Sequence, residues 1–278
     1  MILYKYCDPL GAIKILDTFE LKLPFISEVN DPLECLPVFC SEQGETKIKE
    51  RCLIGFKRKD FPINEELINN LDNKIKNGEM QELLKIQARN HAKEWNNSKG
   101  CLLSVSKTAQ NTVMWAHYAE KHKGVVIGFD FKTFFKLHEK QIGIVMEPVK
   151  YSKERAKIDV SIDQMTEEWW KAMEYALLNK SSDWQYEQEY RTIFLDDMLK
   201  QWCELGLACL KEYKGKSTFF LRFYPMAIRE VIFGLFTEES LKSEIKTLLN
   251  RQELKHVKSS KTVESDSYDF NLAEEKIS

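Results

Sequence analysis

Two kinds of sequence pattern divide the chain, and this division limits the fold more than any other feature. Apolar runs typical of β-strands occur near both ends, whereas residues 43–99 are rich in Lys, Glu and Asn, with apolar positions at helical spacing. Residues 124–130 are almost entirely apolar, which is typical of a strand buried on both faces. We therefore predict an α+β fold with mostly antiparallel, mixed sheets flanked by helices and a helical insertion over 43–99.

The insertion is predicted to hold two helices that pack through their apolar stripes, followed by an exit turn at residues 96–100. With 278 residues, the chain fits one large domain, because single cores stop growing near ~250–300 residues. Hydrophobic residues make up 43%, enough to fill such a core. We predict a single α+β domain over 1–260 and a C-terminal strand or flexible tail over 261–278.

Charge and hydropathy narrow the classes of partner. Lys plus Arg number 41 against 43 Asp plus Glu, so the net charge of −2 gives no global footprint for nucleic acid, although a local basic groove remains compatible. No apolar run approaches the ~18–20 residues that span a bilayer, and residues 1–6 alternate instead of forming a signal core. The seven cysteines are widely spaced without a C-x-x-C pair. We expect a cytoplasmic protein with free thiols, no membrane segment and no local zinc or redox motif.

The strip of residues 184–191 is the densest group of polar and aromatic side chains. In an extended conformation, alternation puts Glu187, Glu189 and Arg191 on one face. The opposite face would carry Trp184, Tyr186, Gln188 and Tyr190. Carboxylates two residues apart on a strand lie ~7 Å apart and repel, so a cation, a donor or a substrate must satisfy them. The alternative is a purely structural ladder in which Arg191 neutralises one glutamate.

Two further motifs are candidates. Residues 114–124 predict a helix that delivers Tyr118 and His117 in front of the apolar strand, but His117 and His122 are five apart, which is unsuited to a helical metal pair. A structural role is the simpler interpretation for both histidines. The loop carrying Asn30 and Asp31 could bind ribose hydroxyls or a metal, or could be an ordinary Asx turn.

Several common enzyme motifs are missing from the sequence. It contains no G-x-G-x-x-G, no phosphate-binding Gly-Lys-Ser/Thr loop, no His-Glu-x-x-His and no Gly-x-Ser-x-Gly. These absences disfavour the usual dinucleotide oxidoreductases, P-loop NTPases, zinc proteases and serine hydrolases.

Taken in order, the motifs resemble those of a large bacterial family catalogued as a domain of unknown function, number 2971. The resemblance covers about residues 1–235. It rests on Leu-Tyr-Lys-Tyr at 3–6, Leu-Lys-Leu-Pro at 21–24, Asn-Asp-Pro-Leu-Glu at 30–34, Met-Trp-Ala-His-Tyr-Ala at 114–119, Lys-Gly-Val-Val-Ile-Gly-Phe-Asp at 123–130, Lys180, the strip 184–191 and Glu-Val-Ile-Phe-Gly at 230–234.

The motif order is also similar to that of ADP-ribosyltransferases, which split the nicotinamide glycosidic bond of NAD. This resemblance implies an ADP-ribosyltransferase-like fold, with Glu189 gripping the ribose 2′-hydroxyl and Glu187 orienting or deprotonating the acceptor. Arg191 would bind a phosphate or neutralise Glu189. The other implied substrate-binding positions are Tyr4, Lys5, Asn30, Asp31, Ser104, Ser106, His117, Tyr118, Trp184 and Tyr186, with an aromatic ring stacking on nicotinamide.

Three hypotheses follow, and the sequence does not choose between them. The first is an ADP-ribosyltransferase-like enzyme with NAD as substrate, no bound cofactor and a protein or nucleic-acid acceptor, acting as a toxin or in anti-phage defence. The second is a metal-dependent nuclease or phosphodiesterase that uses Asp31, Glu34, Glu187, Glu189 and His117. The third is a non-enzymatic ligand- or protein-binding module with an aromatic platform. The oligomeric state and the biological trigger are not encoded in these motifs.

Overall fold

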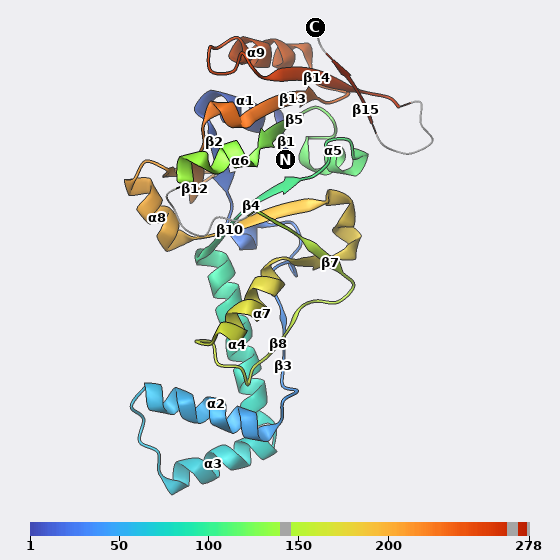
Figure 1. The fold of residues 1–278 in the computed structure, drawn as a ribbon. Coiled ribbons are helices and arrows are strands. Elements are labelled where there is room, and N and C mark those ends of the chain that lie inside the picture. The colour runs from blue at the N-terminus through green and yellow to red at the C-terminus, as the bar shows by residue number, and fades with distance from the viewer. Residues whose placement is uncertain (140–145, 266–271, 277–278) are drawn as a thin grey trace. The chain divides into compact units, whose positions relative to one another are not determined.

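The computed structural model describes residues 1–139, 146–265 and 272–276, and its internal contacts divide them into two units (Figure 1). Unit 1 comprises residues 1–24, 101–149 and 183–278, and unit 2 comprises residues 25–100 and 150–182. Unit 2 therefore contains the stretch expected as an insertion together with a second segment from later in the chain.

An eight-stranded sheet forms the centre of unit 1. Its strands lie in the order β15 (Ala273–Lys276), β14 (Lys258–Val263), β13 (Ile228–Phe233), β5 (Val125–Asp130), β1 (Ile2–Cys7), β4 (Gly100–Ser106), β10 (Glu189–Leu195) and β6 (Glu147–Pro148). Strand β1 pairs antiparallel with β4 and β5, whereas β13 and β14 are parallel. The predicted α+β class with a mostly antiparallel, mixed sheet is confirmed.

The helices of unit 1 include one whose start is fixed by a capping side chain. Helix α1 (Pro9–Thr18) starts behind Asp8, whose carboxylate accepts the Gly11 amide at 2.6 Å, with proline in its first turn. The other helices of the unit are α5 (Thr112–Tyr118), α6 (Phe131–Phe134), α8 (Asp196–Glu204) and α9 (Glu239–Leu249), with the short 3₁₀ helices η2 (Phe135–His138) and η4 (Pro225–Ala227). Strand β5 is buried along its length, as its apolar sequence predicts.

A second, three-stranded sheet of unit 1 has the order β11 (Ala208–Tyr213), β12 (Lys216–Arg222) and β2 (Glu20–Leu23). Helix α8 and strand β11 have no counterpart in the sequence-based prediction. Strand β11 has only one buried position, so its apolar alternation is weak. Its position in the sheet is fixed by pairing with β12 over the register Ala208 to Tyr213.

Unit 2 is mainly helical. It contains α2 (Glu45–Arg58), α3 (Glu65–Lys76), α4 (Glu79–Ser98) and α7 (Glu167–Leu177), the 3₁₀ helix η1 (Ile26–Glu28), and the strand pairs β3 (Val38–Cys40) with β8 (Lys157–Asp159) and β7 (Lys150–Ser152) with β9 (Asn179–Ser181). The prediction of two helices over 43–99 is wrong, because α2 is a third. The expected exit turn at 96–100 is also wrong, since α4 continues to Ser98.

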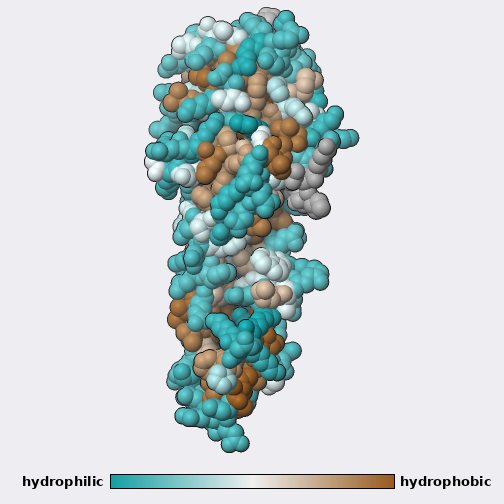
Figure 2. Space-filling view, turned by 90° about the vertical axis from the view of Figure 1, so that its left-hand side faces the viewer, coloured by the Kyte–Doolittle hydropathy of each residue, from teal (hydrophilic) through white to brown (hydrophobic). Residues whose placement is uncertain are grey.

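The helices of unit 2 enclose a core that includes Ile48, Leu71 and Ile75. The predicted apolar stripes therefore do pack inward. Other apolar side chains of these helices and their connections remain exposed, namely Ile54, Phe61, Ile63, Leu83 and Ile86. Figure 2 shows brown apolar patches between teal polar atoms on the face turned to the viewer.

The strip 184–191 is not one extended strand. The 3₁₀ helix η3 (Ser182–Glu187) occupies its first part, Gln188 has a positive φ of 44°, and only then does β10 begin. Burial nevertheless alternates as the period-two argument expects, with Glu187, Glu189 and Arg191 buried and Gln188 exposed. The sequence of residues 142–151 predicts another strand, which falls partly on residues 140–145, outside the described residues. Its described part forms the short strands β6 and β7.

Candidate functional site

Helix α5 positions the first side chain of the site, Tyr118. Asn111 caps the helix by accepting the Met114 amide at 3.1 Å. Trp115 is fully buried, and its indole N–H donates to the Ala109 carbonyl at 2.7 Å, so the helix is fixed at both its start and its middle. Three residues further on, Tyr118 lies on the adjoining part of the helix surface and packs against the same apolar cluster as Trp115.

The end of strand β4 holds the loop that carries Glu187. The Ser106 hydroxyl donates to the Glu187 carbonyl at 2.6 Å, and the Lys107 amide donates to the Gln188 carbonyl at 3.0 Å. Ser106 and Glu187 are both buried. Because these contacts fix the backbone on both sides of the peptide bond after Glu187, the direction of its side chain is determined by β4.

Tyr118 and Glu187 meet, although they are 69 positions apart in the sequence. The phenolic hydroxyl donates to Oε1 of the glutamate at 2.6 Å, a length typical of a strong bond to an ionised carboxylate. A tyrosine fixes the carboxylate without adding a positive charge. Glu187 thus combines burial, a fixed orientation and a neutral donor, which are properties of a carboxylate that can take up a proton or bind a sugar hydroxyl.

Glu189 has a different environment. Arg191 donates from Nε and Nη2 to the two carboxylate oxygens of Glu189, both at 2.9 Å, and both side chains are buried. This bidentate geometry is the strongest form of ion pair that two side chains on one strand can make. It is the pairing of Arg191 with one glutamate that the sequence left as the alternative.

Tyr4 and Lys5, the two candidates of the first motif, are separated by the alternation of strand β1. Lys5 donates to the Ser104 carbonyl at 2.8 Å. Burial lowers the pKa of Lys5, while Cys7, Glu189 and Glu187 oppose that shift electrostatically. Ser104 therefore contributes its backbone oxygen, not its hydroxyl, to this contact.

Tyr4 instead donates to Oε1 of Glu230 at 3.0 Å. The contact crosses strand β5 at Gly128, which lies in register between Tyr4 and Glu230. A Cβ at Gly128 would lie 2.8 Å from Cγ of Glu230, so glycine is required for this close approach. Burial and the Glu230 charge raise the pKa of the Tyr4 phenol. The resemblance includes Glu230 but assigns it no role. Its contact with Tyr4 follows from strand order, because β13 lies next to β5, which lies next to β1.

The aromatic candidates take separate positions. The rings of Trp184 and Tyr186 lie 6.1 Å apart, and both side chains are half-buried. Tyr186 packs against the apolar cluster that also contacts Tyr118 and Tyr4. His117 is exposed on α5, with its ring 6.2 Å from that of Tyr118.

Asn30 and Asp31 belong to unit 2. The Asp31 carboxylate accepts the Leu33 amide at 2.9 Å, which is the Asx turn that the Asn-Asp-Pro sequence allows. Glu34, at the end of the same motif, forms a buried ion pair with Lys180 at 3.4 Å. Two motif residues that are far apart in the sequence thus form one contact inside unit 2. The sequence named both without linking them, because neither local spacing nor periodicity relates them.

Among the described residues, no group of three or more His, Cys, Asp or Glu side chains could hold a metal ion. The metal-dependent nuclease hypothesis therefore gains no support from the described part of the chain. Likewise, no helix in the described ranges has the length and apolar character needed to cross a membrane.

Comparison with known families bears directly on this segment. Residues 114–192 match the model of a family described as a protein of unknown function (DUF2971). The match supports the resemblance to this family over that segment of the chain. The DUF2971 match begins in α5, two residues after its start, and ends in β10, one residue after Arg191, so it spans Tyr118, Glu187, Glu189 and Arg191. No curated protein and no solved structure gives a match.

Proposed function

We propose that unit 1 of this protein cleaves the nicotinamide glycosidic bond of NAD or a related nucleotide, with Glu187 as the central acid–base residue. The observation that carries the proposal is the 2.6 Å hydrogen bond from Tyr118 to Glu187. It joins the two ends of the family match and orients a buried carboxylate through a neutral donor. The similarity of the motif order to ADP-ribosyltransferases supplies the reaction class.

In this proposal the bond between the ribose C1′ and the pyridinium nitrogen breaks, and its electron pair goes to the nitrogen, so neutral nicotinamide leaves. Positive charge develops on the ribose, and a nearby carboxylate stabilises it more in the transition state than in the ground state. An acceptor hydroxyl or water then attacks C1′ and passes its proton to Glu187. The Tyr118 bond keeps the carboxylate in the orientation that this transfer needs.

Glu189 and Arg191 have a supporting role in this scheme. Since Arg191 spans both oxygens of Glu189, this carboxylate is less suited to gripping a ribose hydroxyl than the motif resemblance implies. We assign the pair to fixing strand β10, whose first residue follows the Glu187–Gln188 loop. Lys5 donates to the Ser104 carbonyl and so helps to fix β1 beside β4.

The test is nicotinamide release from NAD by the full-length protein, with water and with protein or nucleic-acid acceptors. Glu187→Gln is expected to lower the rate by roughly 10²–10⁴-fold, the usual contribution of a positioned acid–base group. The matched control is Glu204→Gln, which changes an exposed carboxylate of the same unit. If the wild type releases no nicotinamide, or if Glu187→Gln keeps the full rate, the proposed function is wrong.

A second candidate is a ligand-binding module without catalysis, which the neutralised Glu189–Arg191 pair favours. Here Trp184 and Tyr186 would form the aromatic platform. Calorimetry with NAD separates the two functions. Binding without release of nicotinamide, weakened by Trp184→Ala, would support the module and remove the enzyme.

A further inference from the structure

One face of the three-stranded sheet of unit 1 has a composition that the proposed function does not use. In the register of this sheet, Lys22 lies opposite Phe220, which lies opposite Cys209, so the three point to one side. The other side carries Leu21, Leu23, Phe219, Leu221 and Ala208, all buried in the core. Alternation therefore turns the polar side outward.

This outward side gathers lysines around two aromatic rings. The ammonium groups of Lys14, Lys22 and Lys214 lie 5.3, 5.0 and 5.5 Å from the centre of the Tyr213 ring. Lys211 lies 5.5 Å from the centre of the Phe220 ring, and the two rings are 6.1 Å apart. We call these six residues, Lys14, Lys22, Lys211, Tyr213, Lys214 and Phe220, the lysine–aromatic surface.

The hairpin turn between β11 and β12 explains the position of Lys214. Lys214 and Gly215 have positive φ values of 51° and 76°, as the two central residues of a tight hairpin turn require. The turn holds Lys214 beside Tyr213, the last residue of β11. Lys14 comes from helix α1, a separate element, so the surface is assembled by tertiary structure and not by a run of basic sequence.

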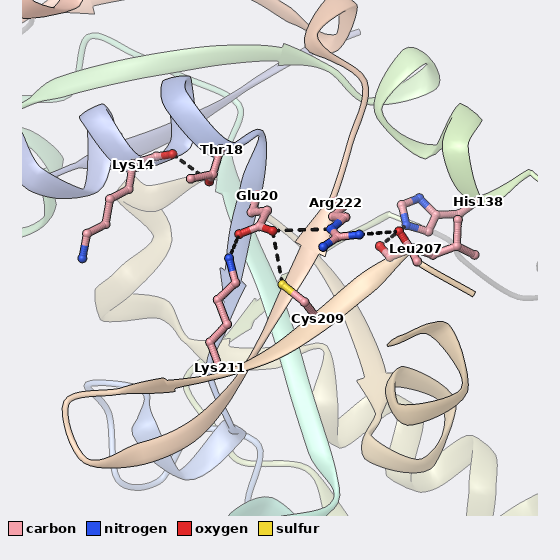
Figure 3. Close-up of polar contacts among 9 residues, drawn as sticks. Lys14, Thr18, Glu20, His138, Leu207, Cys209, Lys211 and Arg222 are labelled. Atoms are coloured by element: carbon pink, nitrogen blue, oxygen red, sulfur yellow. Dashed lines mark hydrogen bonds and ion pairs between the residues drawn. The ribbon is translucent and has the colours of Figure 1, made fainter. Parts of the chain in front are cut away.

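One carboxylate at the edge of this surface is already engaged by several donors. Glu20 is the carboxylate at its edge, and it accepts hydrogen bonds from Lys211, from the Cys209 thiol at 3.2 Å and from Arg222 at 3.4 Å (Figure 3). Burial alone raises the pKa of Glu20, but these donors outweigh it and lower the pKa, so the carboxylate stays ionised. Within the described residues, Lys14 and Lys214 take part in no ion pair.

We propose that the lysine–aromatic surface binds single-stranded nucleic acid. Proteins that bind single strands combine positive charge along the phosphates with aromatic rings on which bases stack. Both elements occur here, on a sheet face with exposed lysines and half-buried rings. The net charge of the whole chain, −2, does not reveal this local excess of positive charge. The proposal does not depend on NAD cleavage.

The test measures binding of the full-length protein to a fluorescent twelve-nucleotide oligouridine by anisotropy at low salt. Lys14→Glu combined with Lys214→Glu is expected to weaken binding roughly ten-fold or more, and to flatten the salt dependence by about 0.7 per lysine lost. Both side chains are exposed, so the fold should persist, which circular dichroism checks. The matched control is Lys246→Glu with Lys255→Glu, two exposed lysines elsewhere in unit 1.

Stacking is tested separately at Tyr213. Tyr213→Ala should weaken oligouridine binding several-fold, whereas Tyr213→Phe should retain it, because the ring and not the hydroxyl stacks on a base. Three results would overturn the proposal: no oligouridine binding by the wild type, equal weakening by the two double variants, or binding to vesicles of anionic phospholipid without binding to oligouridine. Nicotinamide release is measured in parallel, so loss of either activity is distinguishable from loss of the other.

Discussion

Two buried acidic contacts, one in each unit, differ in the charge of their partner. In unit 1, Glu187 is held by the neutral hydroxyl of Tyr118, whereas in unit 2, Glu34 is paired with the ammonium of Lys180. An ammonium group adds a positive charge beside the acid, whereas a hydroxyl adds a hydrogen bond alone. The two motifs are thus joined to distant segments by different contacts: Glu34 by an ion pair inside unit 2, and Glu187 by the hydroxyl of Tyr118 inside unit 1.

Glu189 in unit 1 resembles Glu34 more than it resembles its neighbour Glu187. Its partner, Arg191, is charged, bidentate and buried. Proximity in sequence is therefore a poor guide to role within the strip 184–191. The following predictions test whether charged partners mark structural acids and whether the neutral partner marks the reactive one.

The largest expected effect is that of Arg191→Ala. It removes the bidentate partner of the buried Glu189 carboxylate, which costs about 3–5 kcal/mol of the free energy of unfolding. Urea denaturation measures this loss. The double variant Glu189→Leu with Arg191→Leu should regain most of the stability, because it removes both charges. A loss below about 1 kcal/mol in the single variant would mean that the pair is not structural.

Lys180→Ala should destabilise unit 2 by a smaller amount, about 3 kcal/mol, because its 3.4 Å contact with Glu34 is longer than the 2.9 Å bonds of the bidentate pair. Hydrogen exchange measured by mass spectrometry can localise the effect. Faster exchange is expected in the peptides of unit 2, with unit 1 unchanged. Equal changes in both units would show that the pair does more than hold unit 2 together.

Tyr118→Phe should cost about 1–2 kcal/mol of stability, since it removes one hydrogen bond to a buried carboxylate without removing a counter-charge. Its effect on nicotinamide release should be larger than its effect on folding. Tyr224→Phe, at an exposed tyrosine of the same unit, is the control. If Tyr118→Phe lowers stability but leaves release unchanged, Glu187 does not depend on Tyr118 for catalysis.

The smallest effect concerns pH and the ion pair of Asp163 with Arg58 in unit 2. Hydrogen bonding from Arg58 lowers the pKa of Asp163 below its unfolded value. Its stabilisation is therefore present above about pH 4 and is lost as the pH falls through the folded value. Because Arg58 is 46% exposed, we expect no more than about 1 kcal/mol. Asp163→Asn should flatten the acid side of the stability curve, and an unchanged curve would contradict this assignment.

Sequence periodicity predicted most elements of the central sheet. The apolar run at 124–130 predicts strand β5, and the alternating residues 1–6 and the run 101–106 likewise predict β1 and β4; all three strands occur close to these positions. Helix α2 was missed because only one of its residues, Ile48, is buried. The extended conformation predicted for 184–188 was wrong because pairing of Gln188 with Lys107 and its positive φ interrupt the strand.

The candidate site was predicted as a set of residues but not as an arrangement. The sequence identified Tyr118, Glu187, Glu189 and Arg191, and local spacing was sufficient to suggest that Arg191 neutralises one glutamate. It could not link Tyr118 to Glu187, because a contact across 69 positions depends on how β4 and β10 bring α5 and the loop together. It also could not assemble the lysine–aromatic surface, whose residues come from α1, β2, β11, its turn and β12.

The sequence by itself determined the fold class, the apolar strands and the residue types of the family motifs, because these follow from local periodicity and composition. The tertiary structure decided which partner each buried acid received. Glu187 accepts a hydrogen bond from Tyr118, and Glu34 pairs with Lys180, so both contacts join segments distant in the chain that local periodicity cannot link. The pair of Glu189 and Arg191 is different, because the two residues are neighbours on one face of one strand.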